Sequence, residues 1–158
     1  MNSKYRIFYF LLFTFCLTGC LPSPHYQKVE TVPQNAWSYT FKPKFTFEIT
    51  DTTASYETYF IIRHTQAYAF SNLWLWLYIK TPGDSTVRRE RVNVPLAQSN
   101  GKWLGNGMGE LFQQQLRLNL DSVSFKKPGT YQITVEQNMR VNPLPEVLNV
   151  GLVVKKRG

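Results

Sequence analysis

The sequence predicts an all-β protein, an antiparallel β-sandwich of the immunoglobulin-like or jelly-roll-like kind that follows an N-terminal lipoprotein signal peptide. From Trp37 onward, apolar and polar residues alternate with the two-residue period of strands. Seven or eight such segments are short, and Pro, Gly and other turn residues separate them. Few stretches have helical periodicity, so two packed sheets are the expected architecture.

The first twenty residues have the layout of an export signal. Lys4 and Arg6 precede an 11-residue apolar run, Ile7 to Leu17, and the small residue Gly19 stands directly before Cys20. The run is shorter than the roughly 20 residues that cross a bilayer. The sequence around the cysteine resembles the bacterial lipobox, Leu-x-Gly-Cys, in which the thiol receives a diacylglycerol, the preceding bond is cut and the new amine is acylated. We therefore expect residues 1–19 to be removed and Cys20 to carry the lipid; the alternative is an ordinary signal peptide or a membrane helix with an incidental cysteine.

The composition of the processed chain limits its chemistry. Cleavage before Cys20 leaves 139 residues (158 minus 19), enough for one domain. Cys16 leaves with the signal and Cys20 is lipidated, so a disulfide, a thiol nucleophile and a cysteine metal site are excluded. Loss of Lys4 and Arg6 lowers the net charge from +8 to +6. This charge favours anionic neighbours such as lipid phosphates or acidic proteins, or it reflects solvated strand faces. Nucleic acid is excluded for an exported protein.

Residues 20–35 are predicted to form a lipidated tether. Pro22, Pro24 and Pro33 lie in this stretch, and it has little apolar periodicity. Fully extended, the fifteen residues after Cys20 could reach about 50 Å. Residues 36–158 are predicted to form a single sandwich domain.

The first half of that domain contains four predicted strands. Residues 45–49 and 56–63 alternate between apolar and polar side chains. Residues 73–80 and 86–94 flank Thr81-Pro82-Gly83-Asp84, whose Pro-Gly pair favours a tight turn. These last two strands should therefore form a hairpin.

The second half contains one ambiguous segment and two clear strands. Residues 109–120 fit either a helical turn or a strand, and we interpret them as a loop or short turn that enters a strand. Residues 131–136 and 146–155 alternate clearly. Their predicted inward residues are Tyr131, Ile133 and Val135 in the first strand, and Leu148, Val150, Leu152 and Val154 in the second.

Aromatic side chains form the candidate partner or ligand face. In residues 73–78 the leucines alternate with Trp74, Trp76 and Tyr78, and Trp103 lies in a glycine-rich stretch, residues 100–109. Such aromatics contribute strongly to binding proteins or sugars. The alternative is that the strand is buried on both faces and that Trp103 plugs a gap between the sheets. Periodicity does not separate the two.

No catalytic residue, metal site or cofactor is predicted. His25 and His64 are isolated, the carboxylates are dispersed, and no nucleophile elbow, zinc-binding helix or calcium loop occurs. The chain is therefore expected not to be an enzyme.

Four short motifs suggest a family. They are Phe70-Ser71-Asn72-Leu73, Asn100-Gly101-Lys102-Trp103-Leu104-Gly105, Gly129-Thr130-Tyr131 and Gln137-Asn138-Met139-Arg140. With the lipobox, their order resembles the gliding-motility lipoprotein GldH family of Bacteroidota over roughly Trp37 to Lys155. Two details depart from the family pattern: Asn138 stands where alanine is expected, and the central hairpin is more basic.

The resemblance implies a cell-envelope lipoprotein needed for gliding and linked to type IX secretion, with no catalytic residues. Its expected partners are the membrane, through palmitate-type acyl chains on Cys20, and other envelope lipoproteins or motility and secretion proteins. No acidic residue follows Cys20, which favours the outer membrane with the domain facing the periplasm. The alternative function is an envelope carbohydrate- or peptidoglycan-binding module that uses the same aromatics.

Overall fold

The structure is a computed structural model that describes residues 24–120 and 125–157. Its elements, in chain order, are β1 (Tyr26–Thr31), the short 3₁₀ helix η2 (Pro33–Asn35), β2 (Ala36–Trp37), β3 (Lys44–Ile49), β4 (Tyr56–Thr65), β5 (Asn72–Lys80), β6 (Arg88–Pro95), β7 (Asn106–Met108), β8 (Leu111–Leu118), β9 (Gly129–Gln137), β10 (Leu144–Pro145) and β11 (Val147–Lys156). The predicted signal peptide and Cys20 lie outside the described residues. Within those residues, no helix has the length and apolar character that a bilayer crossing requires.

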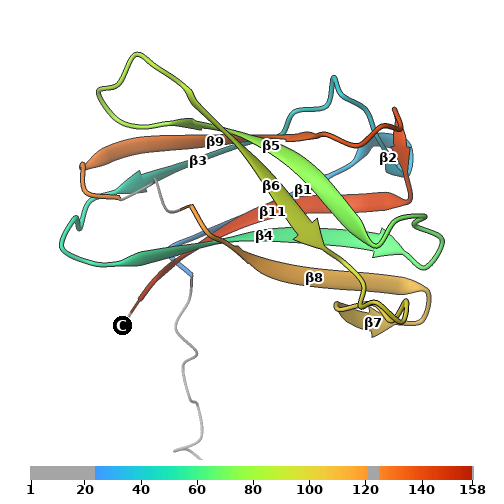
Figure 1. Cartoon of the computed structure of the whole chain (residues 1–158). Helices are drawn as coiled ribbons and strands as arrows, with labels where there is room; N and C mark the ends of the chain where they lie inside the picture. The colour runs from blue at the N-terminus through green and yellow to red at the C-terminus, as the bar shows by residue number, and fades with distance from the viewer. Residues whose placement is uncertain (1–23, 121–124, 158) are drawn as a thin grey trace, which may run out of the picture.

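Two antiparallel sheets face each other (Figure 1). One has the strand order β1-β11-β4-β8-β7 and the other β3-β9-β5-β6, while β10 and β2 form a small separate pair. The eight longest strands, in chain order, are β1, β3, β4, β5, β6, β8, β9 and β11. Counted in this order, strands 1, 8, 3 and 6 lie side by side in the first sheet, and strands 2, 7, 4 and 5 lie side by side in the second. This is the strand order of a jelly roll. The predicted β-sandwich is confirmed, and of the two kinds expected it is the jelly roll.

The core lies between the sheets, because each long strand turns one face inward. β5 shows this most clearly, since Leu73, Leu75, Leu77 and Ile79 are fully buried while the residues between them are half-buried. The predicted inward residues of 45–49 and 131–135 are buried as well.

The predicted hairpin is present. β5 and β6 pair antiparallel, and the amide of Asp84 donates to the carbonyl of Thr81 over 3.3 Å. Gly83 has a φ of 76°, a left-handed conformation that glycine adopts without strain.

The ambiguous segment is mostly strand. Residues 106–108 and 111–118 form the hairpin β7–β8, which turns at Gly109 with a φ of 62°. β8 then pairs with β4 along its whole length. The helical alternative for residues 110–115 is therefore wrong, and pairing with β4 explains why a polar stretch rich in glutamine is a strand.

The predicted inward face of the last strand is wrong at one position. A bulge shifts the register between Val147 and Asn149, so Val147 is fully buried in place of Leu148. Glu146, at a φ of 68°, precedes the bulge. Strict alternation cannot detect the extra residue that a bulge inserts.

The tether predicted for residues 20–35 is too long. Residues 26–31 are strand β1, which pairs with β11 over six residue pairs. β1 is an edge strand whose residues are mostly exposed, so it is held by its backbone and lacks an apolar pattern. The sandwich therefore begins at Tyr26, ten residues before the predicted boundary at Ala36.

Candidate interaction surface

The aromatic residues of β5 lie on the outer face of their sheet. Trp74, Trp76 and Tyr78 are half-buried there, because the leucines between them occupy the inner face. On β6, Arg91 pairs with Trp76 and Arg89 pairs with Tyr78. The alternation of the sequence left open whether this aromatic face is exposed or buried. In the structure it is half-buried, because neighbouring side chains cover part of each ring.

Arginine and aromatic groups alternate along this face. The guanidinium carbon of Arg89 lies 3.6 Å from the ring centroid of Trp76 and 5.5 Å from that of Tyr78. The guanidinium carbon of Arg91 lies 4.3 Å from the ring centroid of Trp74 and 5.9 Å from that of Trp76. Each such contact is worth about 0.5–2 kcal/mol. We call these five residues the Trp–Arg ladder.

One carboxylate lies at the edge of the ladder. Tyr78 donates its hydroxyl hydrogen to Glu136 Oε2 over 2.8 Å, and Lys42 Nζ lies 3.0 Å from the same oxygen. Burial alone would raise the pKa of Glu136, but these two hydrogen bonds and the positive charges of Lys42 and Arg89 together outweigh it and hold the pKa below its usual range. Glu136 thus stays ionised and positions Tyr78 and Lys42 beside the arginines.

The two departures from the family pattern meet at the ladder. Arg91 Nε donates to Asn138 Oδ1 over 3.0 Å, so an alanine at position 138 would lose this bond. The amide of Trp74 donates to the sulfur of Met139 over 3.2 Å, and the amide of Asn138 donates to the carbonyl of Trp74. The Gln137–Arg140 motif therefore fastens the end of β9 to β5.

Gln137 holds the chain on the inner side of the same motif. It is 1% exposed, and its side-chain nitrogen donates to the carbonyls of Trp37 (3.3 Å) and Val141 (3.1 Å). Its side-chain oxygen accepts from the amide of Met139 at 2.8 Å. One amide thus joins β2, β9 and the loop before β10.

Trp103 lies in a different cluster. Its ring is 4.6 Å from that of His64 and 5.8 Å from that of Phe112, on the sheet opposite to β5. His64 is fully buried, its Nδ1 lies 2.9 Å from the carbonyl of Thr65, and burial lowers its pKa. The structure brings together Trp74, Trp76 and Tyr78 but not Trp103.

Sequence reasoning missed both the His64 cluster and the arginines of the ladder. A signal for His64 was present, since alternation in β4 puts it on the same side as Phe60 and Ile62. The arginines could not be assigned without the β5–β6 register. Among residues 24–120 and 125–157, no group of three or more His, Cys, Asp or Glu side chains is placed to hold a metal ion.

The comparison with known families is decisive. Residues 24–154 match the family model described as "GldH lipoprotein". The chain belongs to the GldH lipoprotein family. It is 26% identical over 163 residues to a "gliding motility lipoprotein GldH homolog" of Christiangramia forsetii. This match covers 99% of this chain and 98% of the relative. It is 26% identical over 130 residues to the "gliding motility lipoprotein GldH" of Flavobacterium johnsoniae, covering 78% of this chain and 79% of the relative.

Membership in the GldH family confirms the resemblance drawn from the motifs. It makes this chain a motility-related lipoprotein with a lipid-anchored place in the cell envelope. Among solved structures, a carbohydrate-binding module specific for non-crystalline cellulose is similar at a TM-score of 0.49 and 10% identity, covering 84% of this chain and 73% of the module. A second such module, from Cellvibrio japonicus, has a TM-score of 0.33 and 13% identity, covering 84% of this chain and 99% of the module.

Proposed function

We propose that this GldH-family protein is a non-catalytic component of the cell envelope that supports gliding motility and assembly of the type IX secretion apparatus. Lipid on Cys20 holds it at the outer membrane, and the sandwich faces the periplasm. The family match over residues 24–154 and the names of its relatives support the motility role. Two or more acyl chains would make the anchoring stable.

The Trp–Arg ladder is the surface proposed to contact another envelope protein. Trp, Tyr and Arg are the residue types that contribute most to protein interfaces. The ladder places all three side by side on an ordered sheet face, so little side-chain freedom remains to be lost on binding. It is the single observation that carries this part of the proposal.

The ladder favours a protein over a sugar as the ligand. A sugar ring stacks on an open aromatic face, whereas the guanidinium groups of Arg89 and Arg91 lie over the rings of Trp76 and Trp74. A carbohydrate- or peptidoglycan-binding module would require these arginines to move away.

Replacement Cys20→Ala tests the anchor. The variant should move from the membrane fraction to the soluble fraction and lose gliding, because the acyl chains have no other attachment point. Fractionation and immunoblotting of cells measure the first result, and colony spreading measures the second. A variant that stays in the membrane fraction contradicts the anchor.

Replacement Trp76→Ala tests the ladder, with Tyr59→Ala as the matched control. Tyr59 is a half-buried aromatic on the other sheet that also lies under a cation, with Lys155 Nζ 4.8 Å from its ring. Crosslinking in intact cells, followed by mass spectrometry, should capture an envelope protein with the parent and with Tyr59→Ala. With Trp76→Ala, recovery should fall about thirtyfold, as expected for a hot-spot residue. Equal recovery from all three proteins contradicts the proposed contact, and glycan binding that depends on Trp76 supports the carbohydrate alternative instead.

A further inference from the structure

The lipid on Cys20 would lie very close to the sandwich. β1 begins at Tyr26, so five residues, 21–25, separate the lipidated cysteine from the first strand. Fully extended, the six steps from Cys20 to Tyr26 span about 20 Å. This inference rests on the anchor proposed above, and it concerns which part of the domain meets the membrane.

The short tether joins the sandwich at one of its two ends. Tyr26 pairs with Val154 near the end of β11, and His25 Nε2 lies 2.6 Å from the carbonyl oxygen of Glu48 near the end of β3. The His25 ring also contacts the ring of Tyr56 at the start of β4. We call this the tether end; it is the left side of Figure 1, where β3 connects to β4.

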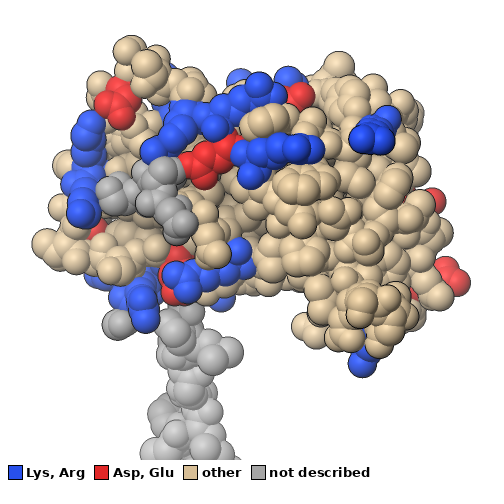
Figure 2. All heavy atoms as spheres, in the orientation of Figure 1, with Lys and Arg blue, Asp and Glu red and all other residues tan. Residues whose placement is uncertain are grey.

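Cations line two adjoining hollows at the tether end. A hollow of about 370 Å³ is lined by Arg88, Lys126 and Lys127 together with Thr81, Thr86 and Asp84, and the Thr81 hydroxyl donates to Asp84. Lys126 also lines a second hollow of about 260 Å³ with residues 52–56. Beside that second hollow, the amide of Arg157 donates to the carbonyl of Ser55 over 2.8 Å. Several groups of Lys and Arg atoms are visible on the left part of the surface in Figure 2.

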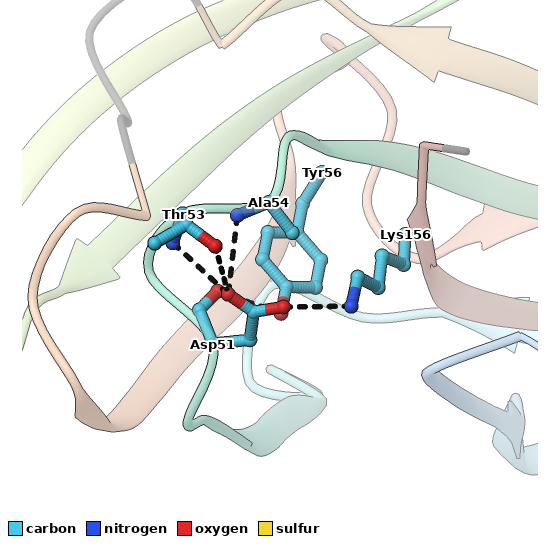
Figure 3. Close-up of polar contacts among 5 residues, drawn as sticks. All are labelled: Asp51, Thr53, Ala54, Tyr56 and Lys156. Atoms are coloured by element: carbon cyan, nitrogen blue, oxygen red, sulfur yellow. Dashed lines mark hydrogen bonds and ion pairs between the residues drawn. The ribbon is translucent and has the colours of Figure 1, made fainter.

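Two acidic residues at this end, Asp51 and Asp84, are already engaged. Asp51 Oδ2 accepts from Lys156 Nζ at 2.7 Å, and its Oδ1 accepts from the hydroxyl and amide of Thr53 and the amide of Ala54 (Figure 3). The bond from Lys156 and those from Thr53 hold the pKa of Asp51 well below its usual range. Asp84 is likewise paired with Lys127 at 3.1 Å. Among the described residues, three cations at this end make no ion pair with a carboxylate: Lys126, Lys155 and Arg157. Glu48 is the carboxylate at this end that makes no ion pair, so positive charge is in excess.

We propose that the tether end binds the anionic lipid headgroups of the membrane that holds Cys20, with a headgroup phosphate in the hollow of Arg88, Lys126 and Lys127. Guanidinium, ammonium and hydroxyl groups are the donors that bind phosphate oxygens. The tether holds them within reach of the headgroups, and each cation near an anionic surface strengthens binding roughly fivefold. The contact would fix the orientation of the domain and leave the outer face of β5 and β6 accessible from the side.

Quenching by lipid tests the contact in the full lipidated protein. Ser85→Cys at the tether end, or Ser99→Cys at the opposite end, provides the one free thiol for a fluorophore, because Cys16 is removed and Cys20 is modified. Each labelled protein is reconstituted into vesicles of phosphatidylcholine alone or with phosphatidylglycerol, both containing a headgroup spin label. The label at Ser85→Cys should be quenched at least twofold more in the anionic vesicles, and the label at Ser99→Cys should not change.

Matched charge variants identify the residues responsible. Neutralisation by Arg88→Gln, Lys126→Gln and Arg157→Gln should return quenching to its value in neutral vesicles, and so should 1 M salt, whose Debye length is about 3 Å. The same charge change at the opposite end, by Arg63→Gln, Lys102→Gln and Arg140→Gln, should leave quenching unchanged.

The outcomes separate the contact from the anchor. Protein that floats with both vesicles but shows equal quenching in both retains the anchor and overturns the contact. An equal loss in both triple variants also overturns it, because overall charge would then suffice. Protein that floats with neither vesicle refutes the anchor and the contact together.

Discussion

Replacement Gln137→Met is expected to lower the free energy of unfolding by about 2 to 6 kcal/mol. Methionine has nearly the same length and volume, so the change removes hydrogen bonds without opening a cavity. The buried carbonyl of Trp37 and the buried amide of Met139 would lose their partners, and each such loss costs about 1–3 kcal/mol. Urea denaturation followed by tryptophan fluorescence measures the difference.

Gln132→Met is the matched control for this change. Gln132 lies on the same strand but on its outer face, and its side-chain hydrogen bond to Thr46 is long at 3.4 Å and exposed. Its replacement should alter the free energy of unfolding by no more than about 0.5 kcal/mol. Equal effects at the two positions would show that the buried amide does not hold β2, β9 and the following loop together.

Replacement Gly151→Val is expected to destabilise the domain by about 3 kcal/mol or more. Valine favours strands, so propensity alone predicts the opposite sign. However, a Cβ at position 151 would lie 2.7 Å from the carbonyl oxygen of Lys28 and 2.9 Å from Cγ2 of Val29. The first of these contacts is with backbone, so β1 itself has to move away from β11.

Hydrogen exchange locates the damage. In Gly151→Val, the amides of β1 and their partners on β11 should lose protection, whereas those shared by β3 and β9 should keep it. Asn149→Val is the control, because its side chain makes only an exposed hydrogen bond to Thr31. Uniform loss of protection in both sheets would contradict a local effect at β1.

Period-two alternation was sufficient to predict the layers of this protein. The inner residues of β3 and β9 were identified because their outer neighbours differ from them in polarity. The Pro-Gly turn then predicted the β5–β6 hairpin correctly. The motifs identified the family without any structural information.

The features that were missed depend on how strands pair with one another, which the alternation within a single strand does not contain. β1 has no apolar face, and its place in the sheet is set by hydrogen bonds to β11, more than 100 residues away in the chain. The ladder depends on the register that puts Arg91 opposite Trp76. The bulge at Val147 reverses the face of one residue, which no regular period can reproduce.

The pairing of β1 with β11 has a mechanical consequence. A pull on the lipid would enter the domain at Tyr26, the first residue of β1, and we consider a pull directed along that strand. The six residue pairs between these strands would then be loaded in shear and share the force, instead of opening one after another. A lipoprotein under such a load would resist the extraction of β1 better than one whose residue pairs open one at a time.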